Sequence, residues 1–264
     1  MSALAAAWLT SGPAHATTTT AAYGADPLQR LRVFPGHGPT VLMIHGGCWR
    51  RSTPSAAEES FAGQVARDTG WTVVTMSYRV VGLRAATEPG DVFNAVRTIE
   101  RGGHGFNPRD VALWGESAGG NLALLAAYKD RFAYPIRAVA SVSGPTQMTQ
   151  MFSAGAQTAL GCVSEYEDST PLSDPSRYQA TSPVDVATAD AAPTYLANAA
   201  TDPFVPAQQA QELAGTLRSK GVRTVDDIVP DESDHALLLE ADRYTSGGVT
   251  VRQRAERFLA TFLR

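Results

Sequence analysis

A serine with glycines on both sides stands where an apolar segment meets a helical one. Ser117 lies in the run Gly-Glu-Ser-Ala-Gly at 115–119, after the apolar residues 111–114 and before a helical pattern over 121–128. A tight turn from a strand into a helix exposes a serine hydroxyl to a substrate. That hydroxyl becomes a nucleophile when a base removes its proton and N–H donors stabilise the oxyanion that forms. The pattern therefore predicts acyl transfer through Ser117, and the alternative is a chance match in an ordinary loop.

A second glycine-rich segment follows another apolar run upstream. Residues 45–49, His-Gly-Gly-Cys-Trp, come directly after residues 41–44. Glycines allow a tight turn that points backbone N–H groups outward. We expect the N–H groups of Gly47 and Cys48 to form an oxyanion hole together with that of Ala118. The alternative is a plain glycine turn after a strand.

One histidine has the place in the chain that the base requires. A nucleophilic serine on a strand–helix turn is followed in chain order by an acid and then a histidine. Of the five histidines, only His235 follows Ser117. The other interpretation of His235 is a solvated histidine in an acidic loop. His45 is expected to brace its own turn by hydrogen bonding rather than to act as the base.

An aspartate after an apolar run is the best candidate for the acid that orients His235. A carboxylate at the position of Asp202 would accept a hydrogen bond from His235 and stabilise the imidazolium that forms on attack. An aspartate before a proline is also a common turn residue. Asp234, Asp227 and Asp174 are weaker alternatives, and Asp234 is too close to His235 along the chain to reach its ring easily.

These groups need a scaffold, and the apolar pattern predicts one. Short apolar runs alternate with helical patterns, as expected for an α/β fold with a mostly parallel central sheet and helices on both faces. The expected strands are 30–34, 41–45, 72–78, 110–115, 136–143, 193–199 and 223–229. The expected helices are 55–68, 91–100, 117–130, 206–220 and 250–263.

One stretch interrupts this alternation. Residues 144–192 are rich in Ser, Thr, Pro and Asp and show weak periodicity. A structureless loop of this length would be unusual. We therefore expect a single α/β domain over 27–264, in which 144–192 forms a small cap after the strand that ends near Ser143. Such an insertion would cover the carboxyl ends of the strands, where ligands bind in open α/β sheets.

The N-terminal residues differ in composition from the rest. Residues 3–9 are apolar and alanine-rich, and residues 14–16, Ala-His-Ala, have the form of a signal-peptidase site, although no positively charged segment precedes them. Residues 1–26 are expected to be a disordered tail or the remnant of a signal peptide. Secretion is therefore expected, with a cytoplasmic location as the alternative. In an exported protein Cys48 and Cys162 could form a disulfide, and two separate buried thiols are the other possibility.

The bulk composition bounds the classes of function. The 264 residues are 18% charged and 44% hydrophobic, with a net charge of −4. No basic run suggests nucleic-acid binding, and no apolar run approaches the roughly 20 residues of a membrane span. Neither cysteine lies in a CxxC or Cys/His cluster, so no structural metal is expected. The oligomeric state stays open.

Four motifs together resemble those of bacterial carboxylesterases of the α/β-hydrolase superfamily, in the hormone-sensitive-lipase-like and feruloyl- and acetyl-xylan-esterase-like branches. The motifs are HGGCW at 45–49, SYRV at 77–80, GESAGGN at 115–121 and TDPFVP at 201–206. The HGGxW form also resembles kynurenine formamidases. The resemblance implies that Ser117, Asp202 and His235 form a catalytic triad without cofactor or metal.

The resemblance leaves the natural substrate open, because several positions depart from the pattern. Ser77 stands where these branches often have Asp or Asn, and Ser-Asp precedes His235 where glycine is frequent. The leading hypothesis is a serine carboxylesterase that hydrolyses short-acyl or aryl carboxylic esters through an acyl-enzyme. One alternative is an arylformamidase-type amide hydrolase with the same triad. The other is a non-catalytic binding module on a hydrolase scaffold.

Overall fold

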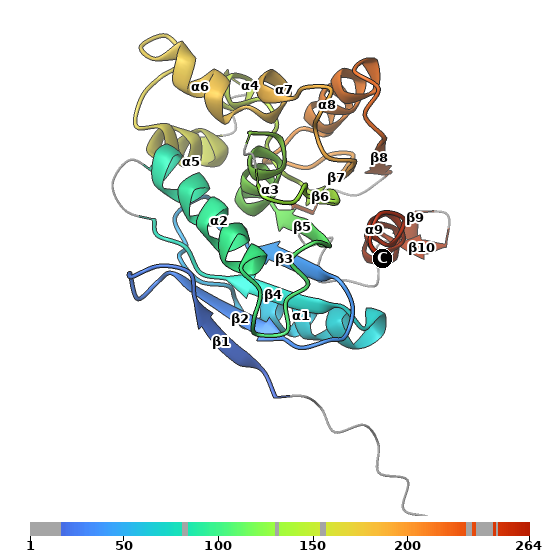
Figure 1. Ribbon diagram of the computed structural model, residues 1–264. Helices are drawn as coiled ribbons and strands as arrows, with labels where there is room; N and C mark the ends of the chain where they lie inside the picture. The colour runs from blue at the N-terminus through green and yellow to red at the C-terminus, as the bar shows by residue number, and fades with distance from the viewer. Residues whose placement is uncertain are drawn as a thin grey trace, which may run out of the picture.

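An eight-stranded, mostly parallel sheet forms the centre of the protein (Figure 1). The computed structural model describes residues 17–80, 84–129, 132–153, 157–230, 234–235, 245–246 and 248–264. The strands of the sheet are β1 (Thr19–Ala22), β2 (Arg30–Phe34), β3 (Thr40–Ile44), β4 (Thr72–Met76), β5 (Val111–Glu116), β6 (Ala138–Val142), β7 (Thr194–Ala199) and β8 (Thr224–Val229). Their order is β1-β2-β4-β3-β5-β6-β7-β8. Strand β2 pairs antiparallel with β1 and β4, and all other neighbours are parallel.

Helices cover both faces of this sheet (Figure 1). The helices are α1 (Ala56–Thr69), α2 (Arg84–Glu100), α3 (Ala118–Lys129), α4 (Met148–Ser153), α5 (Gln157–Glu167), α6 (Pro175–Thr181), α7 (Pro183–Val186), α8 (Ala207–Ser219) and α9 (Val251–Ala260). A short hairpin of β9 (Thr245–Ser246) and β10 (Val249–Thr250) precedes α9. Helices α1 and α9 pack into one core and α2, α3 and α8 into the other. The predicted fold class is confirmed.

Strand β3 shows why the central strands appear in the sequence as continuous apolar runs. Val41 and Met43 belong to the core on the α1 side, whereas Leu42 and Ile44 belong to the core on the opposite face. Successive side chains of a strand point to opposite faces. A strand that is buried on both faces therefore has no polar alternation.

Helix α2 begins earlier than predicted. The sequence predicts this helix over 91–100. The helix in fact starts at Arg84 and carries Pro89 inside it. The turn before the predicted start is packed into the protein, since Glu88 and Pro89 are buried. The fully buried Asp91 carboxylate then accepts hydrogen bonds from Gln29 (2.8 Å) and from the Arg79 guanidinium (2.6 Å).

The described part of the N-terminal segment also differs from the prediction that residues 1–26 are a disordered tail or the remnant of a signal peptide. Strand β1 pairs with β2, and Ala21 and Tyr23 are buried against the sheet. The Tyr23 hydroxyl donates to the Ser77 carbonyl at 2.6 Å. A four-residue edge strand gains much of its stability from backbone pairing that composition does not reveal. The signal-like residues 1–16 lie outside the described part of the chain.

The stretch 144–192 folds as helices α4 to α7 between β6 and β7. One buried side chain ties it to the core of the domain. The Asn121 amide, on α3, donates to the carbonyls of Pro145 and Thr181, both at 3.0 Å. The helix that begins beside Ser117 therefore holds both ends of the insertion.

A buried carboxyl makes the stability of this insertion depend on pH. Glu167, the last residue of α5, is buried and accepts a hydrogen bond from the Thr181 hydroxyl. Burial raises the pKa of Glu167 to about 7 from an ordinary value of 4.5. The folded protein therefore keeps this proton to a higher pH than the unfolded chain does. Its stabilising contribution is full below pH 4.5 and is lost as the pH rises through about 7.

We expect the free energy of unfolding to fall by about 1–3 kcal/mol between pH 5 and pH 8 because of this group. The Glu167→Gln variant should lose that part of the pH dependence, since its amide is neutral throughout. Urea unfolding at four pH values measures it. The matched control is Glu165→Gln, an exposed carboxylate on the same helix, which should keep the wild-type slope. Equal slopes in the wild type and Glu167→Gln would contradict the assignment.

Candidate active site

Ser117 occupies a strained turn between β5 and α3. Its φ of 50° is left-handed, which is uncommon outside glycine. A Cβ added at Gly119 would lie 2.0 Å from the carbonyl oxygen of Ile44, and one at Gly115 would lie 2.1 Å from that of Gly119. Only glycine fits at these two positions. The turn therefore has the sharp geometry that the sequence predicted, with Ser117 at its apex.

The structure brings the three predicted triad residues together from distant parts of the chain. His235 Nε2 lies 2.8 Å from Ser117 Oγ, and His235 Nδ1 lies 2.8 Å and 3.0 Å from the two Asp202 carboxylate oxygens. The Asp202 carboxylate is buried and also accepts from the N–H groups of Phe204 (2.8 Å) and Val205 (2.9 Å). These two bonds fix the carboxylate, so it holds the His235 ring in one orientation.

Two of the alternative acids serve other contacts. The Asp227 carboxylate accepts from the Tyr195 hydroxyl (2.9 Å) and from the Arg254 guanidinium (2.9 Å). Asp174 caps the N-terminus of α6 by accepting from the N–H of Arg177 at 3.1 Å. Their side chains are therefore engaged away from His235, whose Nδ1 faces Asp202.

In the loop after β3, two peptide carbonyls accept hydrogen bonds that brace the loop, and the N–H groups of the same peptide bonds point the other way. The Gly46 carbonyl accepts from His45 Nδ1 at 2.7 Å, and the Gly47 carbonyl accepts from the N–H of Arg50 at 2.9 Å. These peptide bonds are trans, so each following N–H points opposite to the carbonyl. The N–H groups of Gly47 and Cys48 are thus free of those bracing contacts.

The third predicted donor belongs to the helix after the nucleophile. Ala118 is the first residue of α3, and N–H groups of the first helical turn have no partner within the helix. The positive end of the helix dipole also favours negative charge there. Gly47, Cys48 and Ser117 line one cavity, so the predicted donors border the space beside the nucleophile.

His45 braces this loop, as the sequence suggested. Its ring stacks on Tyr78 with centroids 4.2 Å apart, and the Tyr78 hydroxyl donates to the His45 carbonyl at 3.0 Å. Burial lowers the pKa of His45 to about 4, so its imidazole is neutral at pH 7. A neutral ring that donates from Nδ1 to the Gly46 carbonyl supports the loop without adding charge to it.

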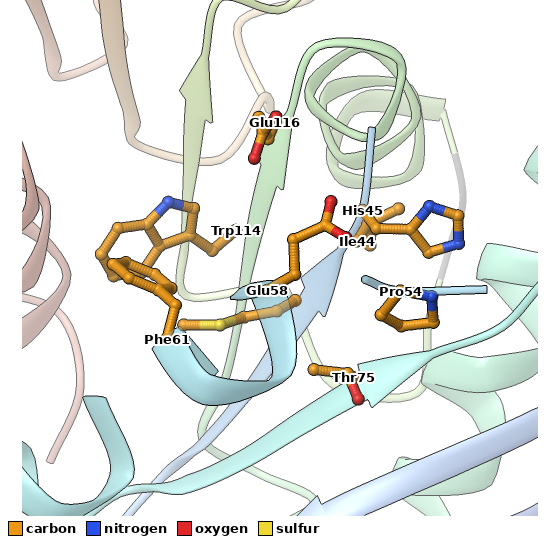
Figure 2. Close-up of a pocket in the computed structure, with 9 residues that line it drawn as sticks. Ile44, His45, Pro54, Glu58, Phe61, Thr75, Trp114 and Glu116 are labelled. Atoms are coloured by element: carbon orange, nitrogen blue, oxygen red, sulfur yellow. The ribbon is translucent and has the colours of Figure 1, made fainter. Parts of the chain in front are cut away.

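An ion pair between the loop and α1 supports the same loop. Arg51 donates to both oxygens of Glu58, each at 2.6 Å, and to the Gly46 carbonyl at 3.2 Å. Burial raises the pKa of Glu58, but the hydrogen bonds from Arg51 and Ser55 outweigh it and hold this pKa below its ordinary value. Figure 2 shows the Glu58 side chain rising from α1 into a small cavity below the loop. At about 20 Å³ this cavity has room for a single water and not for a substrate.

Known proteins resemble this chain in sequence and in fold. The BD-FAE family matches residues 34–217, which is more than half of the chain. The chain belongs to the BD-FAE family. Esterase LipQ of Mycobacterium tuberculosis is 23% identical to it over 82% of this chain and 54% of LipQ. Kynurenine formamidase of Meyerozyma guilliermondii is 32% identical over 39% of each chain.

The match to this BD-FAE protein spans about half the length of LipQ (54%) and 39% of the length of the kynurenine formamidase. Among solved structures, esterase B of Lactobacillus rhamnosis superposes with a TM-score of 0.75 at 22% identity, covering 93% of this chain and 85% of esterase B. This likeness shows the α/β-hydrolase fold that the sequence motifs implied.

An apolar cavity of about 240 Å³ opens beside Ser117 in the BD-FAE chain. Its walls come from the loop after β3, from the insertion and from the loop after β7. The lining residues other than the predicted site are Trp49, Glu116, Pro145, Met151, Cys162, Phe204 and Val205. Phe204 also lies against His235, with ring centroids 5.0 Å apart.

The two cysteines of the BD-FAE chain form a disulfide in the wall of this cavity. Cys48, in the loop after β3, is bonded to Cys162 of α5, and their Cα atoms are 5.3 Å apart. The sequence left this pairing open, because proximity of residues 114 positions apart depends on the fold. The signal-like N-terminal segment was the indication that pointed to it, since disulfides persist in exported proteins.

Sequence reasoning did not identify the wall residues Trp49, Met151 and Phe204. Two of them carried a usable signal, since Trp49 directly follows the predicted donor Cys48 and Phe204 lies two residues after the predicted acid. Over the residues that the structure describes, no group of three or more His, Cys, Asp or Glu side chains could hold a metal ion. None of the described helices combines the length and apolar character needed to cross a membrane.

Proposed function

We propose that this protein is a serine carboxylesterase that hydrolyses small carboxylic esters with short acyl or aryl groups. The observation that carries the proposal is the continuous hydrogen-bonded series from Ser117 Oγ through His235 to Asp202. It ends at an apolar cavity that also exposes the loop of Gly47 and Cys48. A nucleophile, a base, an orienting acid and N–H donors within one site are the set that acyl transfer needs.

In the first half of the reaction, Ser117 Oγ attacks the ester carbonyl carbon while its proton passes to His235 Nε2. The carbonyl oxygen becomes an oxyanion, which the N–H groups of Gly47, Cys48 and Ala118 stabilise. Asp202 stabilises the imidazolium through Nδ1. The ester C–O bond then breaks, and the leaving alkoxide takes the proton from His235. The product is an alcohol and an acyl group bonded to Ser117.

In the second half, water takes the place of the alcohol. His235 removes a proton from the water as its oxygen attacks the acyl carbon, and the same donors hold the second oxyanion. The bond to Ser117 Oγ breaks, and the serine regains its proton from His235. A carboxylic acid leaves, and the site returns to its starting state.

The dimensions of the cavity support a small substrate. Pockets for drug-sized ligands occupy roughly 300–1,000 Å³, whereas this cavity has about 240 Å³ and a mostly apolar wall. Esterase B of Lactobacillus rhamnosis, which shares the fold, has been captured with a C4-C4 tributyrin phosphonate. Short acyl chains are therefore the first class to test on this protein.

Nitrophenyl esters of increasing chain length test the proposal. We expect kcat/KM to be highest for acetate to butyrate and to fall for longer acyl chains as they outgrow the cavity. Rising values up to octanoate would contradict the size argument, and no hydrolysis of any ester would contradict the function.

The same panel should include N-formylkynurenine, because the partial likeness to kynurenine formamidase favours an amide hydrolase as second candidate. A kcat/KM for this amide above that for the best ester would replace the leading proposal by the second one. A protein that binds esters without turnover, and that a fluorophosphonate does not label, would be a binding module.

A further inference from the structure

The loop that carries two of the proposed oxyanion donors has a costly backbone conformation. Three consecutive residues have left-handed φ values: Gly47 at 114°, Cys48 at 60° and Trp49 at 51°. Glycine tolerates this region, but the two residues that follow have side chains and are strained in it. Such a conformation persists only where the surrounding structure holds it in place.

Helix α5 of the insertion contacts this loop at three successive positions. Cys48 is joined to Cys162 by the disulfide. Trp49 stacks on Tyr166, with ring centroids 4.5 Å apart and ring planes 22° from parallel. The next loop residue, Arg50, donates to both carboxylate oxygens of Glu165.

The three helix residues lie on one face of α5. Positions i, i+3 and i+4 are neighbours on a helix surface, which is the spacing of Cys162, Glu165 and Tyr166. We call these three residues the α5 clamp. A single rigid helix thus engages the loop residue by residue, so movement of α5 would be transmitted to the peptide groups of the loop.

The contacts of the clamp differ in strength. Trp49 and Tyr166 are almost fully buried, and the disulfide is covalent. The Arg50–Glu165 pair is exposed on both sides, with 43% and 51% of the side chains accessible, and exposed pairs contribute little. The disulfide and the stacked rings are therefore the parts that hold the loop.

We propose that Cys162 and Tyr166 are positioning residues that fix the oxyanion hole through Cys48 and Trp49. The inference rests on the proposed esterase function and extends it, because it assigns the insertion a part in the rate as well as in the shape of the cavity. Neither side chain donates to the oxyanion or takes part in the proton transfers. Each acts on the backbone of the loop, whose N–H groups face the developing oxyanion. The disulfide would persist in an oxidising compartment, which agrees with the export expected from the N-terminal segment.

The test is to open the disulfide in the folded wild-type protein. Dithiothreitol supplies two electrons and two protons, so the Cys48–Cys162 bond becomes two thiols while the reagent closes to its cyclic disulfide. Removal of one oxyanion donor costs about 10²–10³-fold in kcat. Because opening the disulfide displaces a donor without deleting it, we expect kcat for nitrophenyl acetate to fall about 10–100-fold. KM should change less than about threefold, because the ground-state ester gains little from the donors.

A transition-state analogue separates positioning from a general loss of structure. A trifluoromethyl ketone forms an adduct whose oxyanion occupies the hole, so its inhibition constant should rise in proportion to the loss of kcat/KM. The Cys162→Ala variant should show the same loss, and dithiothreitol should have no further effect on it. Thiol titration before each assay establishes that two thiols have appeared, and near-ultraviolet circular dichroism follows the fold.

Two further variants keep the disulfide intact, in case reduction unfolds the protein. Tyr166→Leu removes the stacked ring from Trp49 and should lower kcat about tenfold, as a partial loss of donor alignment. Tyr166→Phe keeps the ring. Since the Tyr166 hydroxyl has no hydrogen-bond partner within the described residues, this conservative variant should restore most of the kcat.

The outcomes separate this proposal from the proposed function. Unchanged kcat after verified reduction, or a rise in KM with kcat retained, would overturn the positioning role of the α5 clamp, because α5 would then only shape the cavity. Equal loss of kcat in Tyr166→Phe and Tyr166→Leu would overturn it too. If the oxidised wild type hydrolyses no ester, the proposed function itself fails.

Discussion

Replacing Ser117 by alanine is expected to lower kcat for nitrophenyl acetate by about 10⁴-fold or more, because the reaction then has no nucleophile. His235 and Asp202 remain in this variant, but triad members act as a unit and contribute little without the serine. The residual rate should approach what binding and the oxyanion donors alone provide. Steady-state kinetics on purified protein measure the effect.

The Ser117→Ala protein should fold normally, since alanine is smaller than serine and leaves both flanking glycines in place. Its thermal midpoint therefore serves as the control. A variant that keeps its thermal midpoint and more than a tenth of the wild-type kcat would show that the nucleophile lies elsewhere.

Replacing Asp202 by asparagine is expected to lower kcat by about 10³–10⁴-fold while the fold is retained. The amide oxygen can still accept from the N–H groups of Phe204 and Val205, so the loop keeps its hydrogen bonds. The amide nitrogen is a donor, so it cannot accept a hydrogen bond from the N–H of His235 Nδ1 or stabilise the imidazolium. His235 is then held in the wrong tautomer for its proton transfer with Ser117.

Asp227→Asn is the matched control for this variant. Asp227 is also buried and hydrogen-bonded, but it accepts from the side chains of Tyr195 on β7 and Arg254 on α9. We expect this variant to lower stability and to leave kcat within about threefold of wild type. The reverse pattern, with kcat lost in Asp227→Asn and retained in Asp202→Asn, would show that Asp202 is not the acid.

The central sheet and the contacts of the triad could be predicted because their signals are local. A strand buried on both faces must be apolar, as in β3. A sharp strand–helix turn must have small residues on both sides, as Gly115 and Gly119 do around Ser117. Chain order then left His235 as the one histidine that could follow the nucleophile.

The remaining features depend on contacts between distant segments, which no local pattern encodes. The early start of α2 goes with the burial of Glu88 and Pro89 in its added turns. The pairing of β1 follows from an edge that β2 leaves open. The Cys48–Cys162 bond needs α5 to lie across the loop after β3, and the composition of the insertion does not indicate where its helices pack.

The most direct measurement of the central claim is the mass of the intact protein after reaction with a fluorophosphonate, followed by peptide mapping. The proposed nucleophile predicts one adduct per chain, located on Ser117, with ester hydrolysis lost in the same proportion as the adduct forms. The Ser117→Ala protein should stay unlabelled, and His235→Ala should react far more slowly than wild type. An adduct on another residue, or labelling of Ser117→Ala at the wild-type rate, would contradict the account.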